Sequence, residues 1–356
     1  MHIPTEVAEL TPDWFAAILD APVTQVEVVD AHSGTTGRAR VRLSYIPPDA
    51  GPGLVFVKLA PFDPRQRRFL DFTGIGVAET QLYATLARAG RLPVRLPAVW
   101  HAETDGTRFV MVLEDLPSAG CRFPTREDDD FPALVTSTVV ELAALHAAYW
   151  ESELFSTELS WVPDRAGFGP GGGKDPTTAS AAGTFIAKAL DRFSAEMPAV
   201  FTRVGRLYVD RTAEILDLWD QGERTLIHGD AHLGNLFADG ARTGFFDWAM
   251  LSHSPGVRDV AYFCCNSVPT GLRREMEGPL LDRYCSELAG HGVSLDREEA
   301  GELYRLFSVF SWVSATSTAA MGSRWQPEAV GRGGMLRATA ALEDLDAAGL
   351  LEARLS

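Results

Sequence analysis

Hydrophobic and polar positions in the first third of the chain follow the period of β-strands. Ahead of them, Thr11-Pro12-Asp13 predicts the start of a helix, because threonine caps a helix and proline fits its first turn. The segments that follow are short, rich in Val and Leu, and separated by Gly, Pro and Asp, which is typical of a small antiparallel sheet. We expect strands at residues 24–31, 38–46, 53–60 and 108–116, and a helix at about 75–89.

Beyond residue 116 the apolar positions recur with the spacing of helices instead. Residues 163–183 interrupt this pattern, since they are dense in Gly, Pro, Ser and Thr. This segment is expected to be a loop, which is either a lid or merely an insertion. Helices are predicted over residues 135–150, as one or two helices within 184–219, over 297–321 and over 335–355.

The change of period divides the chain into two parts. A chain of 356 residues, 46% of them hydrophobic, is long enough to build two lobes. The predicted fold class is therefore α+β and bilobal. Residues 1–115 are expected to form a small antiparallel-sheet lobe with an N-terminal helix, and residues 116–356 a larger, mainly helical lobe.

The charge balance argues against a nucleic-acid or membrane partner. The chain has 48 acidic and 32 basic residues and a formal net charge of −16, so its surface repels phosphate groups. This excess either favours cationic ligands or serves solubility alone. The N-terminus lacks the pattern of a signal peptide, and no stretch approaches 18 uncharged apolar residues. The four cysteines form no CxxC pair, so we expect buried thiols in a reducing compartment, which makes the cytoplasm the default location.

Lys58 stands in an unusually apolar strand, LVFVKLA. A buried ammonium without a partner is costly, so a neutralising group is expected nearby. Glu79 lies on the apolar face of the next predicted helix, together with Leu82 and Leu86. The pattern therefore predicts a Lys58–Glu79 ion pair. Such a pair either holds a triphosphate, as in protein kinases, or is an ordinary buried salt bridge.

A turn ahead of Lys58 joins the predicted strands at 24–31 and 38–46, and it consists of small and hydroxylated residues: Ser33, Gly34, Thr35, Thr36 and Gly37. Backbone amides and hydroxyls in such a turn could cover phosphates. Hairpin turns without any catalytic role use the same residues. The turn also departs from the GxGxxG of protein kinases, since it has only two glycines.

The strongest chemical signal is the segment TLIHGDAHLGNLFADGARTGFFDWAM, residues 225–250. An apolar strand end leads into Asp230, Asn235 follows five residues later, and Asp247 follows an apolar strand after a hairpin turn at Asp239-Gly240. Phosphoryl transfer needs a base that orients the acceptor hydroxyl, and an amide and a carboxylate that offer hard oxygen ligands to magnesium. The spacing matches the protein-kinase catalytic loop and metal site, with HGD in place of HRD and DW in place of DFG.

HGDAHLGN followed by FFDW resembles the signature of the aminoglycoside phosphotransferase and choline kinase superfamily, which has a protein-kinase-like fold. The similarity covers most of the chain in order, from the glycine-containing turn to the metal aspartate. LEDL at 113–116 and the helix ending LHAAYW are most similar to the ecdysteroid-kinase-like branch. The resemblance implies a kinase that uses Mg²⁺ and transfers a phosphoryl group in line from ATP, or another nucleoside triphosphate, directly to a hydroxyl of a small molecule.

The resemblance also implies a role for each motif residue. Asp230 would be the catalytic base, and Asn235 and Asp247 would bind magnesium. Lys58, positioned by Glu79, would contact the phosphates. The first lobe would bind the nucleotide, and the second would carry catalysis and substrate binding.

Five further residues receive supporting or binding roles in the same way. Backbone groups near Glu114 and Leu116 would meet the adenine. His228 and His232 would brace the catalytic loop by hydrogen bonds. Asp259 would steady that loop, unless it is only a helix-start carboxylate.

Other functions and acceptors stay open. A catalytically silent nucleotide-binding scaffold is the alternative from another class, and the complete set of motif residues argues against it. A protein kinase is disfavoured, because HRD, DFG and APE elements are absent. The first expectation for the acceptor is an apolar alcohol, sterol-like or polyketide-like; the alternative is an aminoglycoside or a choline-type amino alcohol. We infer no obligate protein partner.

Overall fold

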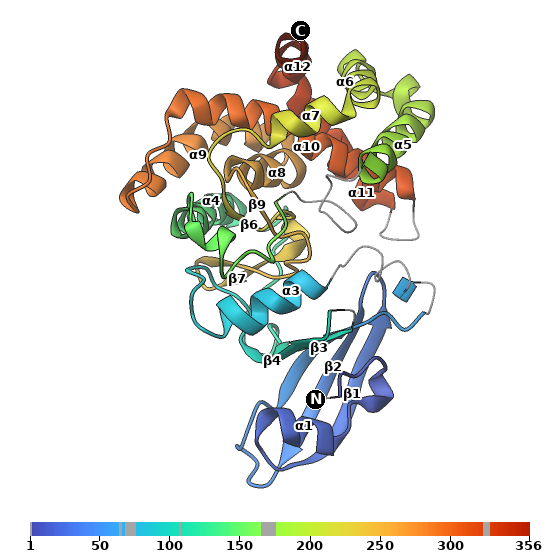
Figure 1. Cartoon of the computed structure of the whole chain (residues 1–356), viewed down its shortest axis with the longest axis vertical. Helices are drawn as coiled ribbons and strands as arrows, with labels where there is room; N and C mark the ends of the chain where they lie inside the picture. The colour runs from blue at the N-terminus through green and yellow to red at the C-terminus, as the bar shows by residue number, and fades with distance from the viewer. Residues whose placement is uncertain (1, 64–65, 68–75, 107, 165–175, 323–327) are drawn as a thin grey trace. The chain divides into compact units, whose positions relative to one another are not determined.

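The computed structural model describes the chain except for residues 1, 64–65, 68–75, 107, 165–175 and 323–327 (Figure 1). It divides into two compact units. Unit 1 contains residues 1–123 together with 237–240 and 244–250, and unit 2 contains the remaining segments. The predicted α+β class is confirmed, since a five-stranded antiparallel sheet is joined to a mainly helical remainder. The lobe boundary after residue 115 stays a prediction.

The sheet of unit 1 has the strand order β1-β2-β3-β5-β4, and each neighbouring pair is antiparallel. One face of it packs against α1, whose Trp14 and Phe15 are buried in the same apolar cluster as the inward residues of β2. Thr11 caps this helix as expected, because its Oγ1 accepts from the Trp14 N–H at 3.2 Å. The elements are α1 (Pro12–Leu19), β1 (Val23–Ser33), β2 (Gly37–Tyr45), β3 (Leu54–Leu59), β4 (Val99–Thr104) and β5 (Phe109–Glu114).

Strand β2 shows why the alternating pattern matters for function. Its odd-numbered residues are buried in the core, whereas its arginines, Arg38, Arg40 and Arg42, lie on the other face. The β2–β3 register places Arg38 directly opposite Lys58. The sequence RARVR therefore lines the Lys58 side of the sheet with positive charge.

Strand β4 corrects the sequence analysis, which assigned no strand between the helix at 75–89 and the strand at 108–116. It is the edge strand of the sheet, and Trp100 is exposed while its other residues are mostly half-buried. An edge strand needs no clean alternation of apolar and polar residues, which is why the pattern was not recognised. The helix expected at 75–89 is α3 (Val77–Leu82), which continues as a π-helical turn, η2 (Tyr83–Ala87); residue 75 is outside the described residues.

Unit 2 is built around the long helix α10, which packs against α5, α8 and α11 (Figure 1). Its helices are α4 (Phe131–Ala148), α5 (Pro176–Phe193), α6 (Ala199–Asp210), α7 (Thr212–Trp219), α8 (Val257–Ser267), α9 (Thr270–Gly290), α10 (Arg297–Met321), α11 (Glu328–Asp344) and α12 (Ala347–Leu355). Short 3₁₀ turns are η1 (Val7–Glu9, in unit 1), η3 (Glu153–Ser156), η4 (Ser194–Glu196) and η5 (Leu233–Asn235). Strand β6 (Thr225–Ile227) pairs with β9 (Ser252–Ser254).

Several helical boundaries differ from the predictions. The segment within 184–219 holds parts of three helices rather than one or two. The last predicted helix is interrupted at Asp346, whose φ of 44° is left-handed, so it becomes α11 and α12. Helix α9 was missed, because Gly278 and Pro279 within it are typical of a break.

Part of the loop expected at 163–183 is outside the described residues. Its last eight residues belong to α5, which begins at Pro176. A proline at the first helical position followed by an alanine-rich run is compatible with a helix start, and this outweighs the Ser and Thr that suggested a loop. The hairpin expected at Asp239-Gly240 is present between β7 (Leu236–Asp239) and β8 (Arg242–Phe245).

Helix α4 is the one described helix that is long and apolar enough, by length and composition, to cross a membrane. It contains Glu141 and packs against α9, and half of the helix is buried inside the structure, as in a core helix. All four cysteines are free, and burial raises the pKa of each thiol, that of Cys265 to about 12.

Candidate active site

Lys58 is the centre of a buried charge cluster in unit 1. Its Nζ donates to Glu79 Oε2 at 2.6 Å and to Asp247 Oδ1 at 2.7 Å. Lys58 and Glu79 are 4% and 1% exposed, so both charges depend on one another rather than on water. Burial favours the neutral amine, but the negative charges of Asp247 and Glu79 outweigh it and raise the pKa of Lys58. The expected ion pair is therefore present, and its lysine stays charged.

Asp247 follows β8 in a left-handed backbone conformation, which is uncommon outside glycine although Asp and Asn adopt it more readily than most residues. Its φ of 61° is left-handed, which costs roughly 1–2 kcal/mol for a residue other than glycine. Such strain is often retained where a side chain must point in one direction for function. The Asp247 carboxylate accepts a hydrogen bond from Lys58 Nζ on Oδ1 and one from Arg38 Nη2 on Oδ2, the latter at 3.3 Å.

Arg38 is a residue that the sequence analysis did not assign to the site. The alternation of RARVR indicates that its arginines share one face of the strand, and the strand register of the structure then places Arg38 opposite Lys58. Two cations rather than one thus face the Asp247 carboxylate.

The turn between β1 and β2 is tight and closely packed. Ser33 pairs with Gly37, and the Gly34 N–H donates to the Thr36 carbonyl at 3.0 Å. A Cβ at Gly37 would lie 2.5 Å from the carbonyl oxygen of Ala60, so only glycine fits there. The Thr36 side chain is buried, and its hydroxyl has no hydrogen-bond partner among the described residues. A buried hydroxyl without a partner suits a turn that receives a polar ligand. Thr35, which lies between Gly34 and Thr36 in this turn, is half-buried.

The segment that begins at the end of β5, expected to meet the adenine, is held by hydrogen bonds of its own polar groups. The Glu114 N–H donates to the Ala98 carbonyl at 2.8 Å, and the Glu114 carboxylate accepts from Arg95 and from the Ala98 N–H. The Leu116 carbonyl accepts from the N–H groups of Ala119 and Cys121. These contacts fix the shape of the segment, and the adenine contact stays a prediction.

In unit 2, Asp259 holds the backbone of the segment that carries Asp230. Its Oδ2 accepts from the His228 N–H at 2.7 Å, and its Oδ1 accepts from the Gly229 N–H at 2.9 Å. Asp259 is fully buried in the first turn of α8, and His146 Nε2 lies 3.4 Å from Oδ2. Burial alone would raise the pKa of Asp259, but the contact with His146 and the backbone donor keep it below its ordinary value. The carboxylate is thus both near a helix start and a brace for the loop.

The two histidines of the motif also hold backbone groups. His228 Nδ1 accepts from the Asp230 N–H at 3.2 Å, and His232 Nδ1 accepts from the Gly234 N–H at 3.0 Å at the start of η5. An accepting ring nitrogen carries no proton. Both side chains therefore shape the loop on either side of Asp230, as the sequence analysis expected of them.

Both oxygens of the Asp230 carboxylate are held by side chains. Oδ1 accepts from the Tyr262 hydroxyl at 2.8 Å, and Oδ2 accepts from Asn235 Nδ2 at 3.1 Å. Asn235 Nδ2 donates to the Asp230 backbone carbonyl as well, at 2.9 Å. With its nitrogen used in this way, Asn235 offers its carbonyl oxygen to any further ligand. Tyr262 was not predicted, because AYF in a helix reads as part of an apolar face.

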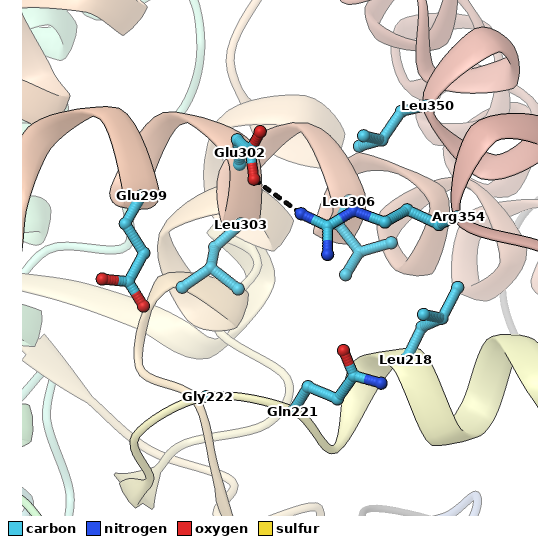
Figure 2. Close-up of a pocket in the computed structure, with 9 residues that line it drawn as sticks. All are labelled: Leu218, Gln221, Gly222, Glu299, Glu302, Leu303, Leu306, Leu350 and Arg354. Atoms are coloured by element: carbon cyan, nitrogen blue, oxygen red, sulfur yellow. Dashed lines mark hydrogen bonds and ion pairs between the residues drawn. The ribbon is translucent and has the colours of Figure 1, made fainter.

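A pocket of about 230 Å³ lies elsewhere in unit 2, between α7, α10 and α12 (Figure 2). The Arg354–Glu302 ion pair, at 2.6 Å, borders it. The motif residues do not line it, and it has no part in the chemistry considered below. Its lining residues are Leu218, Gln221, Gly222, Glu299, Glu302, Leu303, Leu306, Leu350 and Arg354.

The five-stranded sheet with its buried Lys–Glu pair, followed by the braced HGD loop in a helical unit, defines a phosphotransferase of the protein-kinase-like class. Residues 55–295, more than half of the chain, match the phosphotransferase enzyme family known as APH. The chain belongs to this family, and it is a small-molecule phosphotransferase. No curated protein matches the chain.

Solved structures share this fold at low sequence identity. A protein of Ralstonia eutropha JMP134 that is assigned as an aminoglycoside phosphotransferase is 13% identical, with a TM-score of 0.57 and coverage of 96% of this chain and 99% of its own. Choline kinase from Cryptosporidium parvum Iowa II is 12% identical, with a TM-score of 0.56 and coverage of 98% and 96%. The GDP complex of aminoglycoside 2'-phosphotransferase-IIIa is 15% identical, with a TM-score of 0.50 and coverage of 93% and 96%. The predicted superfamily is thus confirmed, whereas the ecdysteroid-kinase-like branch stays a prediction.

Proposed function

We propose that this phosphotransferase uses ATP, or another nucleoside triphosphate, together with Mg²⁺ to phosphorylate a hydroxyl group of a small molecule, with Asp230 as the general base. The observation that carries the proposal is the fixed Asp230 carboxylate, held on both oxygens and followed by a buried asparagine whose carbonyl oxygen is available. A silent scaffold would have no need of such a constrained carboxylate. The location that suits this chemistry is the cytoplasm.

The groups that would hold the nucleotide are in unit 1. Lys58 is a charged ammonium fixed by Glu79, as a phosphate-binding lysine must be. The buried Thr36 hydroxyl and the close-packed Gly37 fit a turn over phosphates. A structural neighbour is a GDP complex, which supports a nucleotide as the phosphoryl donor and leaves the choice of base open.

The donor set also fits magnesium. Asn235 offers an amide oxygen and Asp247 a carboxylate, both hard ligands of the kind that Mg²⁺ prefers. Among the described residues there is no group of three or more His, Cys, Asp or Glu that could hold a metal alone. This agrees with Mg²⁺, which usually takes one or two protein ligands and completes its shell with phosphate and water. When bound, the ion would neutralise charge on the phosphates.

The transfer itself requires one proton acceptor. As the oxygen of the acceptor hydroxyl bonds to the terminal phosphorus, the bond to the nucleoside diphosphate breaks and the diphosphate leaves with the electron pair. The hydroxyl proton passes to the Asp230 carboxylate. No covalent intermediate with the protein is needed, so the residues act by positioning and by charge.

The acceptor is proposed as an apolar alcohol, sterol-like or polyketide-like, on the basis of the sequence branch. A second candidate is an aminoglycoside or a choline-type amino alcohol, favoured by the net charge of −16 and by the named activities of the structural neighbours. Neither candidate involves nucleic acid, a membrane or an obligate protein partner.

A screen for ATP consumption with Mg²⁺ across these two groups of compounds tests the proposal. We expect at least one hydroxylated compound to raise nucleotide consumption and to gain the mass of one phosphoryl group. Asp230→Asn serves as the matched control and should lose both signals. Binding of Mg-nucleotide without turnover on any compound, and without phosphate release to water, would favour the silent scaffold instead.

A further inference from the structure

The Asp230 carboxylate is connected to α10 through two hydroxyl groups. The Tyr262 hydroxyl, in α8, lies 2.8 Å from Asp230 Oδ1 and 3.2 Å from Ser314 Oγ, in α10. A carboxylate can only accept, so Tyr262 must donate its single proton to Asp230. Ser314 must then donate to Tyr262. The chain of donors therefore runs in one direction, from Ser314 through Tyr262 to Asp230.

We propose that Tyr262 is a positioning residue for phosphoryl transfer: its hydroxyl fixes the Asp230 carboxylate in the orientation that accepts the proton of the substrate hydroxyl. This inference rests on the proposed function, because it assigns to Tyr262 an effect that acts through Asp230. Asn235 contacts only Oδ2, where His232 Nε2 also lies 3.6 Å away, so these two neighbours leave Oδ1 without a donor and the carboxylate able to turn about its Cβ–Cγ bond. The second contact, on Oδ1, removes that freedom.

Tyr262 is itself rigid enough for this role. Its side chain is 4% exposed, and its ring lies 5.6 Å from that of Phe310 and 6.4 Å from that of His232. Burial and the neighbouring Asp230 charge raise the pKa of the Tyr262 hydroxyl well above its ordinary value, so the proton that it donates is retained. A donor held by packing in this way needs no rearrangement when the substrate binds.

The same unit contains a matched control. Tyr304 is 2% exposed, and its hydroxyl donates to the Glu277 carboxylate at 3.3 Å. Tyr304→Phe thus removes a buried tyrosine hydroxyl from a carboxylate, as Tyr262→Phe does, but from one outside the catalytic loop. The two variants should lose comparable stability, and only Tyr262→Phe should lose turnover.

The experiment compares kcat, KM and denaturant unfolding of the wild type, Tyr262→Phe, Ser314→Ala and Tyr304→Phe. The assay uses the best acceptor from the screen. Where no compound is phosphorylated, water serves as the acceptor and the release of phosphate from Mg-ATP is measured. A hydrogen bond to a charged group predicts a fall in kcat of about 10- to 100-fold for Tyr262→Phe. The KM for the nucleotide should stay within about twofold, because the contact affects the base and not nucleotide binding. Ser314→Ala should lower kcat in the same direction, and it carries the test if Tyr262→Phe does not fold.

A double-mutant comparison separates positioning from a general structural effect. If Tyr262 acts through Asp230, adding Tyr262→Phe to Asp230→Asn should change the residual rate by less than about twofold. An unchanged or raised kcat in Tyr262→Phe, or a loss equal to that in Tyr304→Phe, would overturn the inference while the proposed function stands. A wild type without phosphoryl transfer to any compound or to water, or an Asp230→Asn variant with full activity, would remove the proposed function and this inference with it.

Discussion

Asp259 shows how a single buried side chain fixes the loop that carries the proposed base. It accepts two backbone N–H groups and lies beside His146, with no exposure to water. Its carboxylate replaces the hydration that those amides lose on burial, so the loop keeps one conformation without any ligand. The shape of the site therefore depends on a residue that need not touch the substrate.

Asp259→Asn should lower the free energy of unfolding by about 3 kcal/mol, because one amide hydrogen would face a backbone N–H and a buried charge-assisted contact would be lost. The pKa of Asp259 is lowered in the folded state, so its contribution is fully present above about pH 4 and is lost as the pH falls through the folded pKa. Denaturant unfolding at neutral and acid pH measures both effects, with Asp282→Asn as an exposed control. A loss at neutral pH no larger than in the control would mean that the brace is unimportant.

At the scale of elements, the buried ion pair joins β3 to α3, and Asp247 brings the segment after β8 to the same lysine. Three elements that are distant in sequence thus share one positive charge. Because an ion pair this deeply buried leaves an uncompensated charge when one partner is removed, the elements depend on one another for stability.

Lys58→Met should therefore cost roughly 3–5 kcal/mol of unfolding free energy. The pKa of Lys58 is raised, so its contribution is complete below about pH 10 and is lost only as the pH rises through the folded pKa; the cost should be constant across neutral pH. Lys188→Met, which changes an exposed lysine over the Phe185 ring, is the control. If the unfolding free energy of Lys58→Met lies within about 1 kcal/mol of that of the wild type, the charge cluster does not stabilise the packing of these elements.

Elements with strong periodicity could be predicted from the sequence, and those at the margins could not. The strands β1, β2, β3 and β5 and the helix α10 follow from apolar alternation or helical spacing. Strand β4 was not predicted because an edge strand needs no regular pattern of apolar residues. Helix α9 was not predicted because Pro279 interrupts the local helical pattern, while packing preserves the helix. Tertiary contacts decide these cases, and they are not visible in a local window.

At the scale of the whole molecule, the motif residues could be predicted because each of them belongs to a short segment with a characteristic sequence. Asp230, Asn235 and Asp247 stand at fixed spacing, and Lys58 is conspicuous in an apolar strand. Arg38 and Tyr262 were not predicted, because their roles come from strand register and from helix packing. The sequence predicts only the chemical class of the acceptor for the same reason, because the side chains that would select one compound come from segments that are distant in sequence.

The most direct test of phosphoryl transfer by this chain is Asp230→Asn, measured for turnover and for Mg-nucleotide binding in the same preparation. The substitution keeps the size of the side chain and removes the proton acceptor. We expect turnover to fall by roughly 10²- to 10⁴-fold. The rise in melting temperature caused by Mg-nucleotide should persist in this variant. In Asp247→Asn, by contrast, the rise in melting temperature caused by the nucleotide should no longer depend on magnesium. Retained turnover in Asp230→Asn would contradict the assignment of the base, and loss of turnover together with nucleotide binding would make Asp230 a structural or metal-binding residue instead.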